Sequence, residues 1–144
     1  MASIAKKIQP HINSAFPAHV CLVGSVLPDG YAQVSPRGSV QVYDDSHISL
    51  WERGRGSTTG NTENGSKLTV YYSNYDLMSQ GVLPIAGIAR LYGVAEIHKS
   101  GPVYDAVWER LIQPEKDRDP DKKGWAVLIK IEKVEDLLGQ PITD

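Results

Sequence analysis

Six segments of this chain alternate between apolar and polar residues with a period of two, which is the pattern of β-strands that bury one face. Turn signals separate several of them, including Pro28-Asp29-Gly30 and Asp44-Asp45. Because an open sheet of this size would leave long unpaired edges, the pattern predicts a closed barrel. We therefore expect a mainly β fold with peripheral helices, a six-stranded antiparallel barrel whose strands span residues 19–27, 31–43, 47–51, 67–73, 85–98 and 125–134.

Two segments outside these strands predict helices that pack on the barrel. Ile4, Ile8 and Ile12 fall on one stripe of a short helix near the N-terminus. Residues 100–112 are amphipathic at helical spacing. Residues 113–124, by contrast, are charged and rich in proline, which predicts a mobile surface loop whose aspartates face solvent.

The composition limits the class of protein and its partners. A chain of 144 residues without an internal repeat predicts a single domain, residues 1–144, with its own core. The net charge of −2 gives no reason to expect a nucleic-acid partner, and no apolar run approaches the length of a membrane span. Cys21 lies in an alternating strand pattern, so we expect a buried, inert thiol. The first residues lack the apolar region of a signal peptide, which predicts a cytoplasmic protein.

The most informative stretch for function is a basic, glycine-rich loop between two predicted strands. It reads Glu52-Arg53-Gly54-Arg55-Gly56-Ser57-Thr58 and opens onto a predicted short helix, residues 58–64. Glycines let a backbone approach an anion closely, and arginine adds a fork of donors that matches phosphate oxygens. The loop therefore predicts a phosphate site, although an ordinary solvated turn with a capping hydroxyl fits the same residues. It matches neither the GxxxxGK[ST] nor the GxGxxG template.

Other kinds of catalytic site find no support in the sequence. The four histidines, His11, His19, His47 and His98, have no metal-ligand spacing, so no metal site is expected. The Gly-x-Ser-x-Gly signature of serine hydrolases is missing, and no other nucleophile or acid–base residue stands out. The catalytic residues therefore stay unassigned. Trp51 is notable because an aromatic ring directly before the basic loop is placed to flank a flat cofactor.

Taken in order, these segments resemble the FMN-binding split-barrel family, which includes pyridoxamine 5′-phosphate oxidase. The resemblance rests on a short opening helix, a strand that ends at Asp29-Gly30, and a following strand that carries Val34-Ser35-Pro36. It continues with a third strand that leads into a phosphate loop and a turn at Glu63-Asn64-Gly65. The resemblance covers roughly residues 4–134. It implies a split β-barrel of the FMN-binding type.

The resemblance also implies where a cofactor binds. Val34, Ser35, Pro36 and Arg37 would run along the isoalloxazine and ribityl chain, and Trp51 and Glu52 would contact the flavin from the end of the third strand. Tyr72 would be a weaker ring contact. Ser57 and Thr58 would occupy the phosphate-ligand positions. The oxidase has basic residues at those two positions, whereas here Arg53 and Arg55 lie just upstream. The positions implied are therefore Val34, Ser35, Pro36, Arg37, Trp51, Glu52, Arg53, Arg55, Ser57, Thr58 and Tyr72.

The function implied by this family is flavin chemistry in a homodimer with cofactor sites at the subunit interface. We expect an FMN-dependent oxidoreductase that transfers hydride or electrons to an unidentified small-molecule substrate. F420 is the alternative cofactor, since it also offers a phosphate and a tricyclic ring. The alternative function is a non-catalytic binding or sensor module for FMN, F420 or heme, or a cofactor-free relic. Vitamin B6 oxidation itself is not expected, because the chain lacks the oxidase's C-terminal segment.

Overall fold

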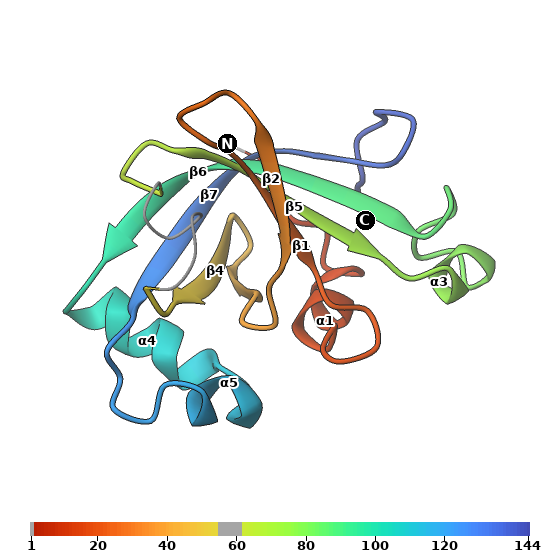
Figure 1. The fold of residues 1–144 in the computed structure, drawn as a ribbon. Helices are drawn as coiled ribbons and strands as arrows, with labels where there is room; N and C mark the ends of the chain where they lie inside the picture. Colours follow the sequence, from red (N-terminus) through yellow and green to blue (C-terminus); the bar gives the residue numbers. More distant parts are fainter. Residues whose placement is uncertain (1, 55–61) are drawn as a thin grey trace.

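A computed structural model describes residues 2–54 and 62–144 of the chain, and within them seven strands form one antiparallel sheet. The strands are β1 (Leu22–Val26), β2 (Ala32–Pro36), β3 (Gln41–Asp44), β4 (His47–Glu52), β5 (Lys67–Ser73), β6 (Ile88–His98) and β7 (Trp125–Glu135). Their order in the sheet is β2-β1-β5-β6-β7-β4-β3 (Figure 1). The predicted mainly β, antiparallel fold is confirmed. The helices are α1 (Gln9–Asn13), α3 (Asp76–Ser79), α4 (Pro102–Arg110) and α5 (Gln113–Asp117).

The predicted strand at residues 31–43 is two strands, which corrects the count from six to seven. β2 ends at Pro36, a residue without an N–H to donate, and the chain then crosses the fold to pair β3 with β4. Among the described residues β2 and β3 are the two edges of the sheet, so the sheet is not closed as predicted. Both edges are short, which limits the number of backbone groups that they leave without a strand partner.

The long strands β6 and β7 form the centre of the sheet, and a β-bulge bends them where they pair. Tyr92 is opposite Lys133 and Gly93 is opposite Ile131, so Glu132 is the extra residue on β7. A Cβ on Gly93 would overlap the carbonyl oxygen of Lys130, so no larger residue fits without a shift of the backbone. The missing side chain at Gly93 therefore leaves room for the backbone of the neighbouring strand.

The core lies on the concave side of the sheet, with the N-terminal segment packed against it (Figure 1). The predicted stripe of Ile4, Ile8 and Ile12 is confirmed, because none of the three side chains is more than 1% exposed. α1 begins only at Gln9, with Pro10 in its first turn, where the missing N–H costs nothing. Cys21 belongs to the same core, and burial raises the pKa of its thiol to about 12, which makes it an unreactive side chain at neutral pH.

A second, smaller cluster joins α4 to the sheet. Trp51 and Ala126 pack against Val107 and Leu111, and α4 lies with α5 at one end of the molecule, opposite α3 (Figure 1). The predicted amphipathic helix is therefore confirmed, with Pro102–Arg110 as its bounds. No helix in the described part of the chain is long and apolar enough to cross a membrane.

The prediction that residues 113–124 form a mobile surface loop is wrong. The segment begins with α5, and the side chains of Glu115 and Asp119 are buried. Glu115 forms an ion pair with Arg118. Asp119 accepts hydrogen bonds from the Trp51 indole, outside the segment, and from the Lys123 backbone N–H, within it. Buried polar groups need partners, and the hydrogen bond from Trp51 on β4 to Asp119 ties the segment to the sheet.

The bulge predicts that Gly93→Ala is destabilising. The new methyl group would force β6 away from the Lys130 carbonyl, and overpacking of this kind typically costs about 1–3 kcal/mol in the free energy of unfolding. Gly24→Ala in β1 is the matched control, because a Cβ there meets no atom closer than 3.8 Å. Chemical denaturation of both variants gives the comparison, and equal stability of the two would contradict the bulge geometry.

Candidate functional site

The residues predicted to bind a cofactor meet at the end of β4, where the basic loop begins. Arg37 reaches across from the segment after β2 and forms an ion pair with Glu52, with 2.7 Å between Nη1 and Oε1. Its other guanidinium nitrogen donates to the Trp51 carbonyl at 3.0 Å, and its backbone N–H donates to the Cys21 carbonyl at 2.9 Å. Since Glu52 is only 3% exposed, this pairing supplies charge compensation that a buried carboxylate requires.

Trp51 is held by a residue that lies 68 positions further along the chain. Its indole Nε1 donates to the Asp119 carboxylate at 2.8 Å. The same carboxylate accepts from the backbone N–H groups of Lys123 at 2.9 Å and Gly124 at 2.8 Å. A Cβ on Gly124 would overlap the Glu52 carbonyl, so glycine permits this close approach of the segment to β4.

The charge state of Asp119 follows from these contacts. Burial alone would raise the pKa of the carboxyl group, but the hydrogen bonds from Trp51, Lys123 and Gly124 and the nearby Arg53 outweigh it. The net result is a pKa below the ordinary value of 3.8, so Asp119 is ionised at neutral pH.

The ring of Trp51 is enclosed by aromatic neighbours. Its centroid lies 5.1 Å from those of Tyr104 and Trp108 on α4, and Lys122 places its Nζ 4.9 Å from the Tyr104 ring. Trp51 is only 2% exposed in the single chain. The buried Trp51 side chain therefore anchors the end of β4, where the basic loop begins. Its contact with a cofactor ring remains a prediction.

The other predicted cofactor residues occupy different positions. Val34, Ser35 and Pro36 lie on β2, where Val34 is 62% exposed. Tyr72 is buried in the core and its hydroxyl accepts from Asn74, so its ring presents no accessible face from this chain. Arg53 is exposed at the start of the loop.

Three further predicted positions, Arg55, Ser57 and Thr58, and most of the predicted helix at 58–64 lie outside the described residues.

Sequence reasoning missed Asp119 and Ser39 as parts of this site. Ser39 is buried and its hydroxyl accepts from the Trp51 N–H at 3.0 Å. Asp119 precedes Pro120, a pair that indicates a turn but says nothing of its distant partner. Within residues 2–54 and 62–144, no three histidine, cysteine or acidic side chains gather into a possible metal site.

The site has features that fit a flavin. β2 is an edge strand, so the outer backbone groups beside Val34 and Ser35 have no strand partner among the described residues and are placed to bond a polar ring edge. Arg53 offers a cation for a phosphate at the start of a glycine-rich loop. The Arg37–Glu52 pair and the Asp119 carboxylate hold the intervening backbone in place.

Comparison with known proteins shows that the fold is shared with split-barrel proteins, which confirms the resemblance at the level of the fold. HupZ of Group A Streptococcus is 22% identical, with a TM-score of 0.70 over 98% of this chain and 99% of its own. A Clostridium acetobutylicum protein of the pyridoxinephosphate oxidase family is 15% identical, with a TM-score of 0.59 over 91% of this chain and 88% of its own. An FMN-binding protein of Syntrophomonas wolfei is 16% identical, with a TM-score of 0.58 over 90% and 82%. No protein-family model and no curated protein matches the sequence.

The carboxylate of Asp119 predicts a pH-dependent contribution to stability. Because folding lowers its pKa, its contribution is present above about pH 4 and is lost as the pH falls through the folded-state pKa. Asp119→Asn replaces an acceptor that serves three donors, so we expect a loss of about 1.5–3 kcal/mol at pH 7 and a smaller loss at pH 3.

Asp121→Asn, at an exposed position in the same segment, is the control. Urea denaturation at both pH values gives the four free energies of unfolding. A loss for Asp119→Asn that is the same at pH 3 and pH 7 would show that the ionised carboxylate is not what stabilises this segment.

Proposed function

We propose that this protein binds FMN and uses it to transfer hydride or electrons to a small-molecule substrate. The observation that carries the proposal is the convergence of an exposed edge strand, β2, and an exposed arginine, Arg53, on one rigid support in a fold shared with an FMN-binding protein. Flavin supplies the redox chemistry itself, and the protein's task is to bind, orient and tune it.

Each element of the site has a separate task in this proposal. Arg53 pairs with the phosphate, with the sequence-predicted Arg55, Ser57 and Thr58 completing the loop. Outer backbone groups of β2 hydrogen-bond the polar edge of the ring, and the exposed Val34 side chain covers part of its apolar surface. Trp51 and Glu52 keep the β4 end in register through Asp119 and Arg37.

A non-catalytic cofactor-binding or sensor module is the second candidate function. The observation that favours this module is that Arg37, Glu52 and Asp119 all have partners within the chain. None of these three ionic groups is therefore left over to act on a substrate. Such a site is well built for holding a ligand and offers no obvious proton donor for a substrate. F420 is the alternative cofactor in both cases, and heme belongs to the module alone.

The cytoplasm is the location that we propose for either function. A single cysteine that is free and buried is suited to a reducing compartment, where structural disulfides are rare.

A comparison of FMN with riboflavin tests the phosphate site. Arg53→Ala should weaken FMN binding at least tenfold, because a charged hydrogen bond contributes about 1.5–3 kcal/mol, and should leave riboflavin binding nearly unchanged. Lys7→Ala, which removes an exposed cation near the N-terminus, should affect neither ligand. Titration followed by flavin fluorescence measures all four affinities. An equal loss for FMN and riboflavin would refute the assignment of Arg53.

Turnover separates the two candidate functions. The FMN-loaded protein is mixed with a reduced nicotinamide under anaerobic conditions, and the flavin absorbance is followed. Bleaching that recurs on readdition of an acceptor supports the oxidoreductase. Stable binding with no bleaching by any of several donors supports the module. A protein that binds none of FMN, F420 and heme would contradict both.

A further inference from the structure

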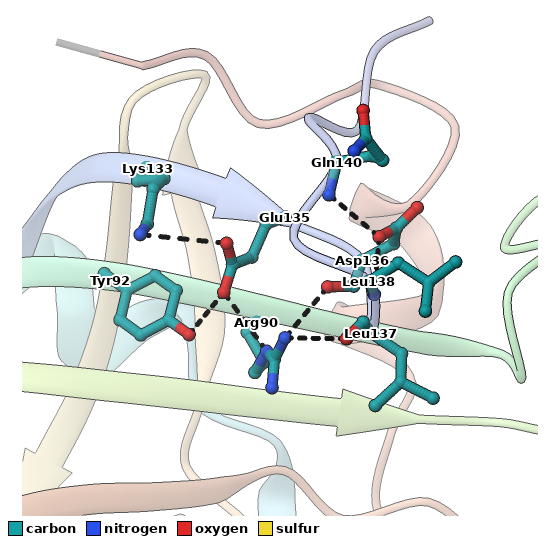
Figure 2. Close-up of polar contacts among 8 residues, drawn as sticks. All are labelled: Arg90, Tyr92, Lys133, Glu135, Asp136, Leu137, Leu138 and Gln140. Carbon is teal, nitrogen blue, oxygen red and sulfur yellow. Dashed lines mark hydrogen bonds and ion pairs between the residues drawn. The ribbon is translucent and has the colours of Figure 1, made fainter.

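Several cations of this fold are paired with acids of the same chain. Figure 2 shows a cluster on the β6–β7 pair, where the Glu135 carboxylate lies 3.3 Å from Arg90 Nε and 3.7 Å from Lys133 Nζ. The Tyr92 hydroxyl donates to the same carboxylate. These two cations are therefore engaged within the chain, which makes them poor candidates for holding an anionic ligand.

Lys99, the residue directly after β6, is a cation in a different setting. It is exposed, and no acidic side chain within residues 2–54 and 62–144 forms an ion pair with it. Its Nζ lies 5.0 Å from the ring centroid of Trp125, the first residue of β7. An aromatic face attracts an ammonium group without neutralising it. The charge of Lys99 is therefore available to an anion.

Lys99 neighbours both described ends of the basic loop. At the start of the loop, Gly54 lies against the Trp125 ring, where an added Cβ would be 3.6 Å from the nearest ring carbon. At the far end, the Asn64 side chain accepts from the Ile97 N–H at 2.7 Å, two residues before Lys99. β4 and β6 end, and β7 begins, at this one edge of the sheet (Figure 1). The sheet therefore brings Lys99 to the loop that is predicted to bind phosphate.

The charges at this edge favour an anion. Arg53 is a second exposed cation, placed directly after the end of β4. The nearby acids are engaged, because Glu52 is in the ion pair described above and Glu96, the only acid of β6, contacts His98. Two cations match the charge of a phosphate monoester, which is close to −2 at neutral pH.

We propose that Lys99 is a second phosphate-binding residue of the flavin site, which acts with Arg53 to make the protein select FMN over riboflavin. The inference rests on the proposed flavin function and adds to it a residue from a different strand end. A lysine carries its charge on a flexible stem, so its ammonium group is able to turn from the Trp125 ring to a phosphate oxygen. Leaving the ring costs little, because cation–π contacts at exposed sites are weak.

Titrations of two Lys99 variants with FMN and riboflavin test the proposal. Lys99→Met keeps an apolar chain beside Trp125 and removes the charge. It should weaken FMN binding about fivefold or more, because a charged contact with phosphate is lost, and should leave riboflavin binding unchanged. Lys99→Arg keeps the charge and should retain most of the FMN affinity.

Lys130→Met is the matched control. Lys130 is also an exposed lysine on β7, but it pairs with His47 at the opposite end of β4 from the basic loop. Its loss should change the affinity for neither flavin. Circular dichroism checks that each variant is folded.

Salt dependence separates a ligand contact from a structural brace between β6 and β7. Added salt should weaken FMN binding less in Lys99→Met than in the wild type, because one charge contact is missing. Equal losses of FMN and riboflavin affinity, or an unchanged salt dependence, would overturn the proposal. A wild type that binds FMN no more tightly than Lys99→Met does would refute Lys99 alone and leave the proposed function intact. A wild type that binds neither flavin would refute the proposed FMN function, and the role of Lys99 with it.

Discussion

The pairing of β6 with β7 is the constraint on which the rest of the sheet depends. β5 and then β1 and β2 attach to one side of this pair, and β4 and then β3 attach to the other. The pair bends at the bulge opposite Gly93, where the backbone of Lys130 comes too close for any side chain. This one bend both curves the core side of the sheet and turns Glu132 and Lys133 outward together.

Local sequence patterns predicted the strands well because burial on one side imposes a period of two wherever it occurs. They failed where contacts between distant residues decided the outcome. Residues 31–43 were predicted as one strand interrupted at Pro36-Arg37-Gly38, but the interruption is a complete end of β2, after which the chain leaves β1 and Arg37 pairs with Glu52. The charged segment at 113–124 was predicted to be solvated, since nothing nearby in sequence reveals that Asp119 is the acceptor for the Trp51 indole. Tyr72 is buried in the core of the single chain, and its ring contact with a cofactor stays a prediction, because alternation indicates which residues share a face and not what a cofactor touches.

The candidate site is a case in which stability and ligand binding draw on the same residues. Glu52 follows Trp51 in the sequence and Asp119 accepts from its indole, and each of these buried carboxylates is compensated by donors from a different part of the chain. The loop between β4 and β5 therefore starts from a backbone that is fixed on both sides. Arg53, the residue that follows Glu52, is exposed at this point. Binding an anion there would not require the site to reorganise first, which is the usual advantage of a prepared site.

The reactivity of the single cysteine, Cys21, reports how often the structure around Arg37 opens. Cys21 lies next to β1, and its carbonyl accepts the hydrogen bond from the Arg37 backbone, so the two cannot separate without exposing this part of the core. Only a thiolate reacts with alkylating reagents, and a buried thiol with a pKa of about 12 forms almost none at neutral pH. Alkylation must then proceed through molecules in which the Cys21 thiol has become exposed to solvent. The rate of thiol labelling under native conditions thus reports how often this part of the core opens.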